Sequence, residues 1–229
     1  MKQIYKILFV TAIVGLGLVL WAIFSERQTS QNEPKPAPKT QNAKEIKILA
    51  FGDSLTAGYN LPSGESYPSQ LEVKLSEAGF SVQVINSGVS GETTRGNLER
   101  AEFIRSQNPD IVLLGIGGND ALRSLPVAET KSNMDKTIRI LQGKANPPVV
   151  LLLQMQSPLN SGFSYKQVFD AIYPNLANTY KLELVPFLTE EIFLDSTNLL
   201  PDGIHLNKKG YGQVVEQHIL QAVIQTLSP

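Results

Sequence analysis

The stretch "KILAFGDSLTAGYN", Lys47 to Asn60, decides the predicted fold of this chain. Its apolar run from Ile48 to Phe51 ends at a glycine, which an aspartate and a serine follow. A short apolar run that stops at a glycine is typical of a buried parallel strand. Ser54 stands where a helix would begin, so it is either a residue that caps the turn or helix, or a reactive side chain at the end of the strand. The stretch alone leaves both roles open.

Four more apolar runs of the same kind follow along the chain. They are short, rich in Ile, Val and Leu, and cover residues 81–86, 110–116, 148–155 and 182–187. The segments between and after the runs are amphipathic, at residues 67–79, 94–107, 127–144, 165–180 and 208–227. Strands that alternate with helices form a parallel sheet through right-handed crossovers. The sequence therefore predicts an α/β domain with a five-stranded parallel sheet and helices on both faces.

Polar segments that contain glycine or proline come after the predicted strands, at residues 52–54, 88–91, 117–120, 154–162 and 200–211. The carboxyl ends of parallel strands meet at one edge of a sheet, and functional sites of such folds lie there. We therefore expect the reactive side chains of these segments to cluster at one edge.

Composition and motifs argue against several classes of function. The 229 residues carry a net charge of −1, without the clustered basic face expected for nucleic-acid binding, and include no cysteine for a disulfide, a thiolate zinc site or a nucleophile. The run "GIGGND", residues 115–120, lacks the third glycine of a dinucleotide-binding loop, and no phosphate-binding loop G-x-x-x-x-G-K-[ST] occurs. Of the two histidines, His218 falls in the last amphipathic segment and is expected to be a packed or rim-facing residue, which leaves no histidine pair for a metal.

The N-terminal part of the chain differs from the rest. Two lysines precede an uncharged apolar run, Ile7 to Phe24, which as a helix is roughly 27 Å long, close to the thickness of the bilayer core. No clear small-x-small cleavage site follows, which favours a retained transmembrane helix over residues 1–24, with a cleaved signal peptide as the alternative. Residues 25–45 are polar and contain three prolines, as in a flexible linker. The α/β domain is expected over residues 46–229.

Covalent acyl transfer is the chemistry for which the sequence offers a complete set of groups. It needs a nucleophile, a base, an acid that holds the base, and donors for the oxyanion. His205 is the only strong base candidate, and Asp202 lies three residues before it in a loop with glycine, close enough to reach one imidazole nitrogen. The alternative is that Asp202 caps the following helix beside a solvated histidine. With His205 as the base, Ser54 becomes the candidate nucleophile.

Two further residues are candidates to stabilise a negative charge that develops near Ser54, at the start of a helix. Asn119 offers a side-chain amide, and Gly91 offers a backbone N–H that no Cβ shields. Asp53 is interpreted as a structural acid that bonds the turn, because the histidine already has an acid partner.

These residues resemble the signature of the SGNH hydrolases, also called GDSL esterases and lipases. The four signature residues occur in order, as Ser54 in "FGDSLTAGYN", Gly91 in "NSGVSGETT", Asn119 in "GIGGND" and His205 in "PDGIHLN". The chain looks most like the bacterial periplasmic acyl thioesterase, arylesterase and lysophospholipase branch. The resemblance implies a flavodoxin-like three-layer α/β/α sandwich and a triad of Ser54, His205 and Asp202. It also implies an oxyanion hole made by the N–H groups of Ser54 and Gly91 and the amide of Asn119.

The resemblance implies a serine esterase that hydrolyses esters or thioesters through an acyl-enzyme, without a cofactor or metal, on small acyl esters or lysophospholipids. The alternatives are an O-acetylesterase of envelope polysaccharide or peptidoglycan and, less favoured, a non-catalytic envelope binding protein. The loop "QSPLNSGFSY", residues 156–165, follows no pattern that assigns an acyl chain length. With a retained N-terminal helix, the expected location is the bacterial inner membrane, single-pass, with the catalytic domain in the periplasm. Cleavage would instead give a secreted enzyme.

Overall fold

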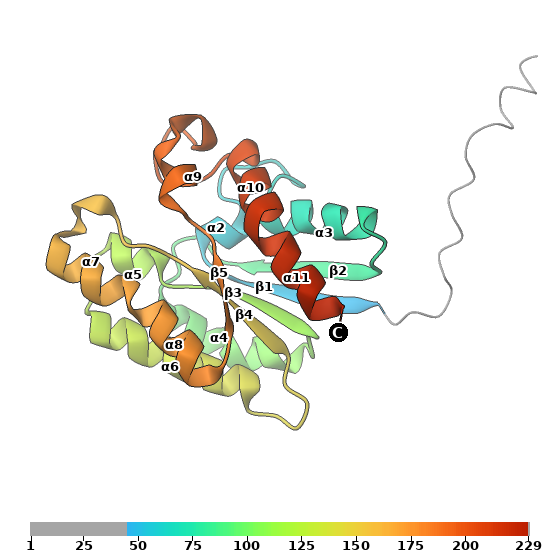
Figure 1. The fold of residues 1–229 in the computed structure, drawn as a ribbon. Coiled ribbons are helices and arrows are strands. Elements are labelled where there is room, and N and C mark those ends of the chain that lie inside the picture. The colour runs from blue at the N-terminus through green and yellow to red at the C-terminus, as the bar shows by residue number, and fades with distance from the viewer. Residues whose placement is uncertain (1–44, 229) are drawn as a thin grey trace, which may run out of the picture. The chain divides into compact units, whose positions relative to one another are not determined.

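The computed structural model describes residues 45–228, except for the side chain of Leu159, and these form an α/β domain around one five-stranded sheet (Figure 1). The strands are β1 (Ile46–Gly52), β2 (Val82–Gly88), β3 (Ile111–Gly115), β4 (Val149–Gln154) and β5 (Glu183–Pro186). Neighbouring strands are parallel, in the order β2-β1-β3-β4-β5. The five predicted strands and the parallel sheet are confirmed.

The predicted transmembrane helix, residues 1–24, lies outside the described residues, and so does the predicted linker, residues 25–45, apart from Glu45. None of the helices formed by residues 45–228 has both the length and the apolar character needed to span a bilayer. The N-terminal anchor and the domain boundary at residue 46 therefore stay predictions.

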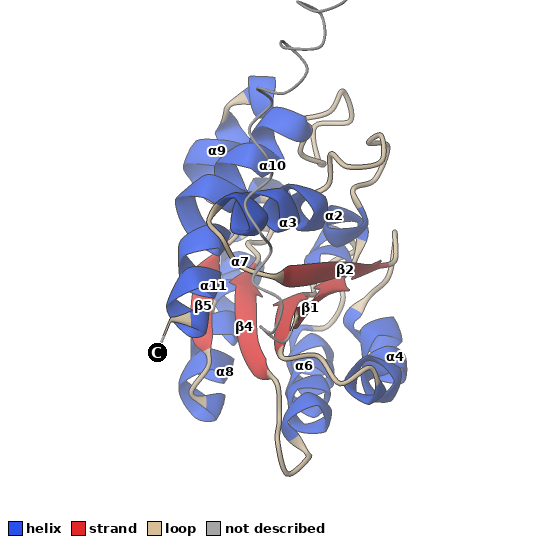
Figure 2. Ribbon diagram, turned by 90° about the vertical axis from the view of Figure 1, so that its right-hand side faces the viewer, coloured by secondary structure: helices blue, strands red, loops and turns tan. Residues whose placement is uncertain are grey.

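Helices cover both faces of the sheet (Figure 2). One face carries α3 (Tyr67–Glu77), α10 (Lys208–Val214) and α11 (Leu220–Leu227), and the other carries α4 (Thr94–Ser106), α6 (Val127–Gln142) and α8 (Ile172–Tyr180). The shorter helices are α2 (Ser54–Ala57), α5 (Gly118–Leu122), α7 (Phe163–Asp170) and α9 (Glu190–Leu194), with two 3₁₀ turns at Leu159–Ser161 and Ser196–Asn198. The apolar residues of β1 and β3 are buried between these layers and form the centre of the core.

One predicted helix, over residues 165–180, consists of two helices in the structure, α7 and α8, which meet at Ala171. Pro174 explains the break. Its nitrogen has no hydrogen to donate to the carbonyl of Asp170, and in a continuous helix its ring would clash with that carbonyl. The helical pattern of the sequence runs across this position, and the proline divides it.

The remaining differences are local. The sequence does not predict α5 and α9, because five residues are too few to show a helical period. The predicted helix over residues 208–227 has the expected ends, but a π-helical turn, Val215–Ile219, separates α10 from α11. His218 lies in this turn and is half-buried, which fits the expected packed or rim-facing residue.

Three glycines bring the ends of β1, β2 and β3 to the same level. Gly52 is in register with Gly88 of β2 and with Gly115 of β3. A Cβ on Gly88 would overlap the backbone nitrogen of Ala57, and a Cβ on Gly52 would overlap the carbonyl oxygen of Gly115. The absence of Cβ atoms therefore lets α2 pack directly on the strand ends, and the segments after all three strands start from one edge of the sheet.

Candidate active site

Ser54 is the first residue of α2, and Asp53 alone separates it from the end of β1. Asp53 caps this helix, because its Oδ1 accepts a hydrogen bond of 3.0 Å from the N–H of Leu55. Ser54 is therefore not the cap, which removes one of the two roles that the sequence leaves open. Ser54 is buried, with 8% of the residue's surface exposed. The first N–H groups of a helix have no acceptor within that helix.

His205 meets Ser54 across 151 residues of sequence, and Asp202 in turn contacts His205. Nε2 of His205 lies 2.8 Å from Oγ of Ser54, and Nδ1 lies 2.7 Å from Oδ2 of Asp202. Oδ1 of Asp202 accepts hydrogen bonds from the N–H groups of Ile204, at 2.9 Å, and His205, at 3.0 Å. The three side chains thus form one continuous chain of hydrogen bonds, and the loop backbone holds the carboxylate at its end.

The alternative role of Asp202, as the cap of the following helix, does not occur. Asn207 caps α10, because its Oδ1 accepts a hydrogen bond of 3.1 Å from the N–H of Gly210. The His205 side chain is only 14% exposed, so it is not a solvated loop histidine. Asp202 is therefore available to the imidazole.

The two aspartates at the site have opposite pKa shifts. Burial raises the pKa of Asp202, but hydrogen bonds from the N–H groups of His205 and Ile204 and from the imidazole outweigh it, so the pKa is lowered overall. Burial raises the pKa of Asp53 to about 6, against the lowering by the Leu55 N–H and the nearby His205. Asp202 thus stays charged over the wider pH range, which suits it to stabilise an imidazolium.

Gly91 and Asn119 lie on the segments that follow β2 and β3. Gly91 has a φ of +80°, which glycine adopts without strain, in a turn closed by a hydrogen bond from the N–H of Glu92 to the carbonyl of Val89. Asn119 is in the first turn of α5 and is 8% exposed. Arg123, just after α5, donates a hydrogen bond of 2.8 Å from Nη2 to the Gly91 carbonyl, so the two segments are in contact.

The Asp53 carboxyl group brings α2 and α5 together. A Cβ on Gly118 would lie 2.9 Å from Oδ2 of Asp53, and the Asn119 side chain lowers the pKa of Asp53 through hydrogen bonding. Asn119 is therefore beside the residue that precedes Ser54. The structure thus brings the sequence-predicted residues to one edge of the sheet, and it gives Asp53 the bonding role in the turn that the sequence indicates.

The sequence analysis misses three side chains that hold this site. The ring centroid of Tyr59 lies 4.6 Å from that of His205, with the planes tilted by 36°. Arg123 joins the Gly91 turn to α5, and Asp120, 2% exposed, accepts hydrogen bonds of 2.8 Å and 2.6 Å from the N–H and Oγ1 of Thr94. No local pattern marks these residues, because each contact joins segments that are far apart in the sequence.

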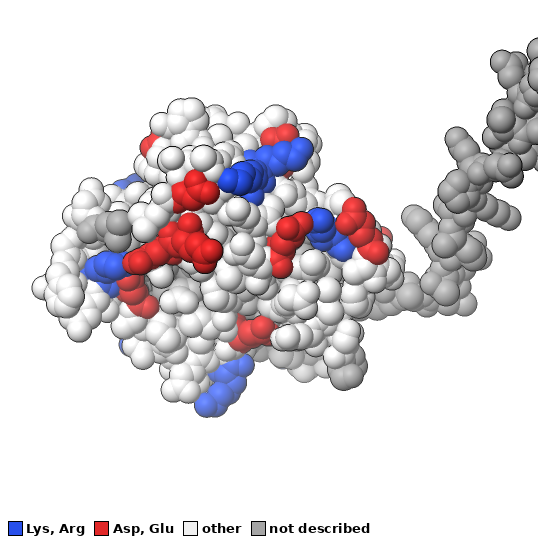
Figure 3. All heavy atoms as spheres, turned by 45° about the horizontal axis from the view of Figure 1, so that its top comes forward, with Lys and Arg blue, Asp and Glu red and all other residues white. Residues whose placement is uncertain are grey.

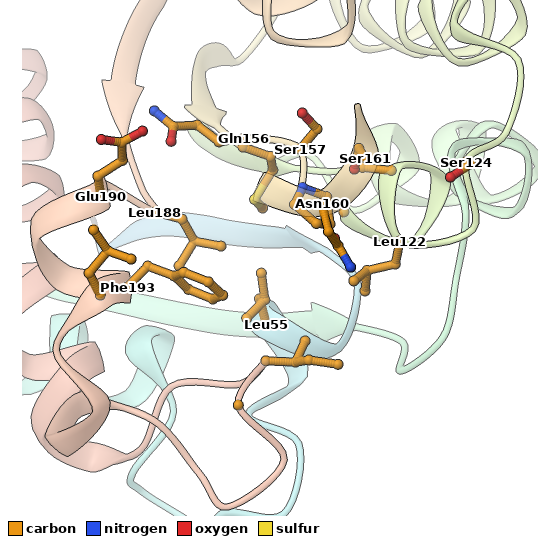
Figure 4. Close-up of a pocket in the computed structure, with 17 residues that line it drawn as sticks. Leu55, Leu122, Ser124, Gln156, Ser157, Asn160, Ser161, Leu188, Glu190 and Phe193 are labelled. Carbon is orange, nitrogen blue, oxygen red and sulfur yellow. The ribbon is translucent and has the colours of Figure 1, made fainter. Parts of the chain in front are cut away.

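A cavity of about 550 Å³ opens beside the site (Figure 4). Three of its lining residues, Leu55, Gly118 and Ile204, are the chain neighbours of Ser54, Asn119 and His205. In Figure 4 the apolar Leu55, Leu188 and Phe193 lie on one side of the cavity, and a polar group lies on the other, consisting of Gln156, Ser157, Asn160 and Ser161. The loop at residues 156–165, which carries no recognisable specificity pattern, supplies this polar side.

Charged side chains on the face shown in Figure 3 are mixed in sign. Basic and acidic groups lie close together, and most of this face is uncharged. This face therefore has no broad patch of one sign that would concentrate a highly charged ligand.

Comparison with known proteins gives consistent matches. The model of the GDSL-like Lipase/Acylhydrolase family matches residues 50–213. An arylesterase of Vibrio mimicus is 39% identical over 160 residues, which are 69% of this chain and 79% of the relative. The thioesterase 1/protease 1/lysophospholipase L1 of Escherichia coli (strain K12) is 34% identical over 162 residues, 70% of this chain and 76% of the relative. A crystal structure of the psychrotrophic esterase EstA from Pseudoalteromonas sp. superimposes with a TM-score of 0.74 at 27% identity, over 81% of this chain and 100% of EstA.

The matched residues 50–213 include the segments that carry Ser54, Gly91, Asn119, Asp202 and His205. The family model and the two relatives each cover more than half of the chain. The resemblance in the sequence is thereby confirmed, and the chain is a hydrolase that belongs to the GDSL-like lipase/acylhydrolase family, the SGNH hydrolases.

Proposed function

We propose that this hydrolase cleaves acyl esters and thioesters, as an arylesterase, acyl thioesterase or lysophospholipase does, through an acyl-enzyme on Ser54. The observation that carries the proposal is the hydrogen-bond chain from Asp202 through His205 to Ser54 beside a cavity with an apolar side. The relatives named arylesterase and thioesterase/lysophospholipase support the same substrate class.

In the first half-reaction, Oγ of Ser54 attacks the acyl carbon while Nε2 of His205 takes the hydroxyl proton across a distance of 2.8 Å. Asp202 holds Nδ1 protonated and stabilises the imidazolium that forms. The imidazolium then protonates the departing alcohol or thiol, and the acyl group stays on Ser54. In the second half-reaction, a water molecule gives a proton to His205 and attacks the acyl-enzyme. The same proton returns to Ser54 as the acid leaves.

The charge that develops on the carbonyl oxygen requires donors that are already in place. We assign this role to the N–H groups of Ser54 and Gly91 and to the Asn119 amide. They come from the ends of three neighbouring strands, and the register of Gly52 with Gly88 and Gly115 fixes these strand ends relative to one another. Donors that are fixed before the substrate binds need little reorganisation, which is the main source of oxyanion stabilisation.

The size of the cavity supports acyl groups longer than acetyl. Its volume of about 550 Å³ and its apolar side, with Leu55, Leu188 and Phe193, give far more room than an acetyl group fills. We therefore favour small to medium acyl esters, thioesters or lysophospholipids as substrates over the O-acetyl groups of envelope polysaccharide or peptidoglycan.

A series of esters of one chromophoric alcohol, from acetyl upward, tests this function together with matching thioesters. We expect kcat/KM to rise beyond acetyl and a fluorophosphonate probe to label the protein. Hydrolysis and labelling should both be lost in Ser54→Ala. Both should be kept in Ser106→Ala, which removes an exposed hydroxyl at the end of α4. Labelling that survives Ser54→Ala would refute the nucleophile, and a maximum at acetyl would favour the O-acetylesterase.

We also propose, from the N-terminal sequence alone, that residues 1–24 form a single-pass anchor in the bacterial inner membrane and that residues 25–45 link it to a periplasmic catalytic domain. Fractionation of cells that express the full chain, followed by N-terminal sequencing, tests this location. Recovery of a soluble form that begins near residue 25 would show that the segment is cleaved.

A further inference from the structure

Arg123 contacts both segments that carry the proposed oxyanion donors. Its guanidinium Nη2 donates a hydrogen bond of 2.8 Å to the carbonyl of Gly91, in the segment after β2. Its backbone N–H donates a hydrogen bond of 3.1 Å to the carbonyl of Asn119, in the helix after β3. One residue therefore spans the gap between the Gly91 turn and α5.

The start of the Gly91 turn and its far side are held by other elements. The N–H of Val89 donates a hydrogen bond of 3.0 Å to the carbonyl of Gly52 at the end of β1. On the α4 side, the Glu92 carboxylate accepts hydrogen bonds from Arg100 and from Asn97. These contacts fix the two flanks of the turn and leave its tip, Gly91, to be held from α5.

Arg123 is the side chain that holds this tip. Apart from Gly91 and its two chain neighbours, Nη2 of Arg123 is the only heavy atom of residues 45–228 within 4 Å of the point where a Cβ of Gly91 would stand, at 3.7 Å. Gly91 has a φ of +80°, and glycine has wide backbone freedom, so a hydrogen bond to its carbonyl restricts the orientation of the whole residue. The N–H of the same residue is a proposed oxyanion donor.

The chemistry of the contact also points to a structural use of the charge. Arg123 is exposed, and its guanidinium donates a hydrogen bond to the neutral backbone carbonyl of Gly91. A charged donor makes a stronger hydrogen bond to a carbonyl than a neutral donor does. An exposed arginine placed in this way keeps a loop in one position at the edge of the site.

We propose that Arg123 is a positioning residue of the oxyanion hole. It holds the N–H of Gly91 and the amide of Asn119 at a fixed separation, so that both donate to the same developing oxyanion. The inference rests on the proposed function, and it assigns to Arg123 no contact with the substrate.

Steady-state kinetics of Arg123→Gln and Arg123→Ala test this inference on two substrates with the same acyl chain, a neutral chromophoric ester and an acyl-coenzyme A thioester that carries phosphates. We expect kcat to fall roughly 10-fold on both substrates, with KM nearly unchanged. This loss is smaller than the ~10²- to 10³-fold loss when an oxyanion donor itself is removed. The rate of fluorophosphonate labelling should fall by a similar factor, because the phosphoryl oxygen occupies the same hole. Free guanidinium should restore part of kcat in Arg123→Ala.

The matched control is Arg95→Gln, since Arg95 is an exposed arginine on α4 that pairs with Glu99. It should keep the wild-type kcat, and the melting temperatures of all variants show whether they are folded. A wild-type kcat in a folded Arg123 variant would overturn the inference. A loss confined to the phosphate-bearing thioester and to KM would overturn it too, because Arg123 would then bind the leaving group. Failure of the wild-type protein on every ester would instead count against the proposed function.

Discussion

Asn119 is a buried amide beside the capping aspartate of α2, and we propose that it donates to an oxyanion formed at Ser54. We expect Asn119→Ala to lower kcat by roughly 10²- to 10³-fold with little change in KM, because the donor acts mainly in the transition state. Steady-state kinetics on a soluble ester measure this, with Asn175→Ala, an exposed position of α8, as the control. A kcat close to that of the control would remove Asn119 from the oxyanion hole.

Asp53 carries a cost in stability that depends on pH. Burial raises its pKa in the folded protein from the ordinary 3.8 to about 6. When the pKa of a carboxyl group is higher in the folded protein than in the unfolded chain, the protonated group favours the folded state. This contribution is fully present below the pKa of the unfolded chain and is lost as the pH rises through the pKa of the folded protein. The shift of about two pKa units corresponds to roughly 3 kcal/mol in the free energy of unfolding. The buried carboxyl group should therefore weaken the fold between about pH 4 and about pH 6.

The variant Asp53→Asn isolates this cost, because the amide oxygen can still accept the hydrogen bond from Leu55 and the side chain does not titrate. Urea unfolding of both proteins from about pH 4 to about pH 8 should show Asp53→Asn gaining stability relative to the wild type as the pH rises. Other titrating groups cancel in this difference. A difference that stays constant across the range would show that Asp53 does not titrate there.

Tyr59 gives His205, the proposed catalytic base, a second support besides its hydrogen bonds. The ring packs on the imidazole of His205, and the N–H of Tyr59 donates a hydrogen bond of 3.1 Å to the carbonyl of Ser54. Aromatic contacts of this kind contribute about 0.5–1.5 kcal/mol, so we expect Tyr59→Ala to lower kcat/KM by roughly 2- to 10-fold. Tyr59→Phe keeps the ring and should stay near the wild type. An equal loss in both variants would assign the effect to the hydroxyl group instead.

At the scale of the element, α10 and the loop before it depend on Asn207. Its Oδ1 caps the helix at Gly210, and its Nδ2 donates hydrogen bonds to the carbonyls of Thr197, at 2.9 Å, and Leu199, at 3.1 Å. We expect Asn207→Ala to lower the free energy of unfolding by about 1–2 kcal/mol, measured by urea unfolding. Thr93→Ala is the matched control, because Thr93 is the N-cap residue before α4, makes no side-chain capping bond and should have a smaller effect. Equal effects would contradict the assigned role of Asn207.

The elements were predictable to different degrees for physical reasons. The strands are short buried runs with ends marked by glycine or polar residues, so the apolar pattern alone locates them to within a residue or two. The division of residues 165–180 follows from Pro174, a local feature that the surrounding periodicity conceals. The helices α5 and α9 form on segments too short to carry a period, and both bury residues within the domain.

At the scale of the whole molecule, the edge of the sheet explains why the candidate site was predictable. Parallel strands place Ser54, Gly91 and Asn119 after neighbouring strand ends, so a correct topology brings them together without knowledge of side-chain geometry. The contacts made by Tyr59 and Arg123 depend on rotamers and on the path of loops, which a strand pattern does not contain. The shape of the cavity depends on the same features, and so does the choice of acyl chain.

The cavity therefore yields a prediction that belongs to the assembled domain. Phe193 of α9 contributes part of its apolar side, opposite residues of the loop after β4. Phe193→Ala should enlarge this side and favour longer acyl chains, because each additional buried methylene contributes about 0.8 kcal/mol. For two substrates that differ by two methylenes, the ratio of kcat/KM, long over short, should rise by up to roughly 10-fold.

Phe103→Ala is the control for this change, since Phe103 is an exposed phenylalanine of α4 that does not line the cavity. It should leave the ratio of kcat/KM unchanged. A uniform loss on all chain lengths in Phe193→Ala would mean that α9 supports the fold rather than the acyl group. A shift toward longer chains in Phe193→Ala, but not in Phe103→Ala, would instead place the acyl group against α9. A side chain that contacts the end of the acyl chain changes the preference for chain length without changing the reaction at the acyl carbon.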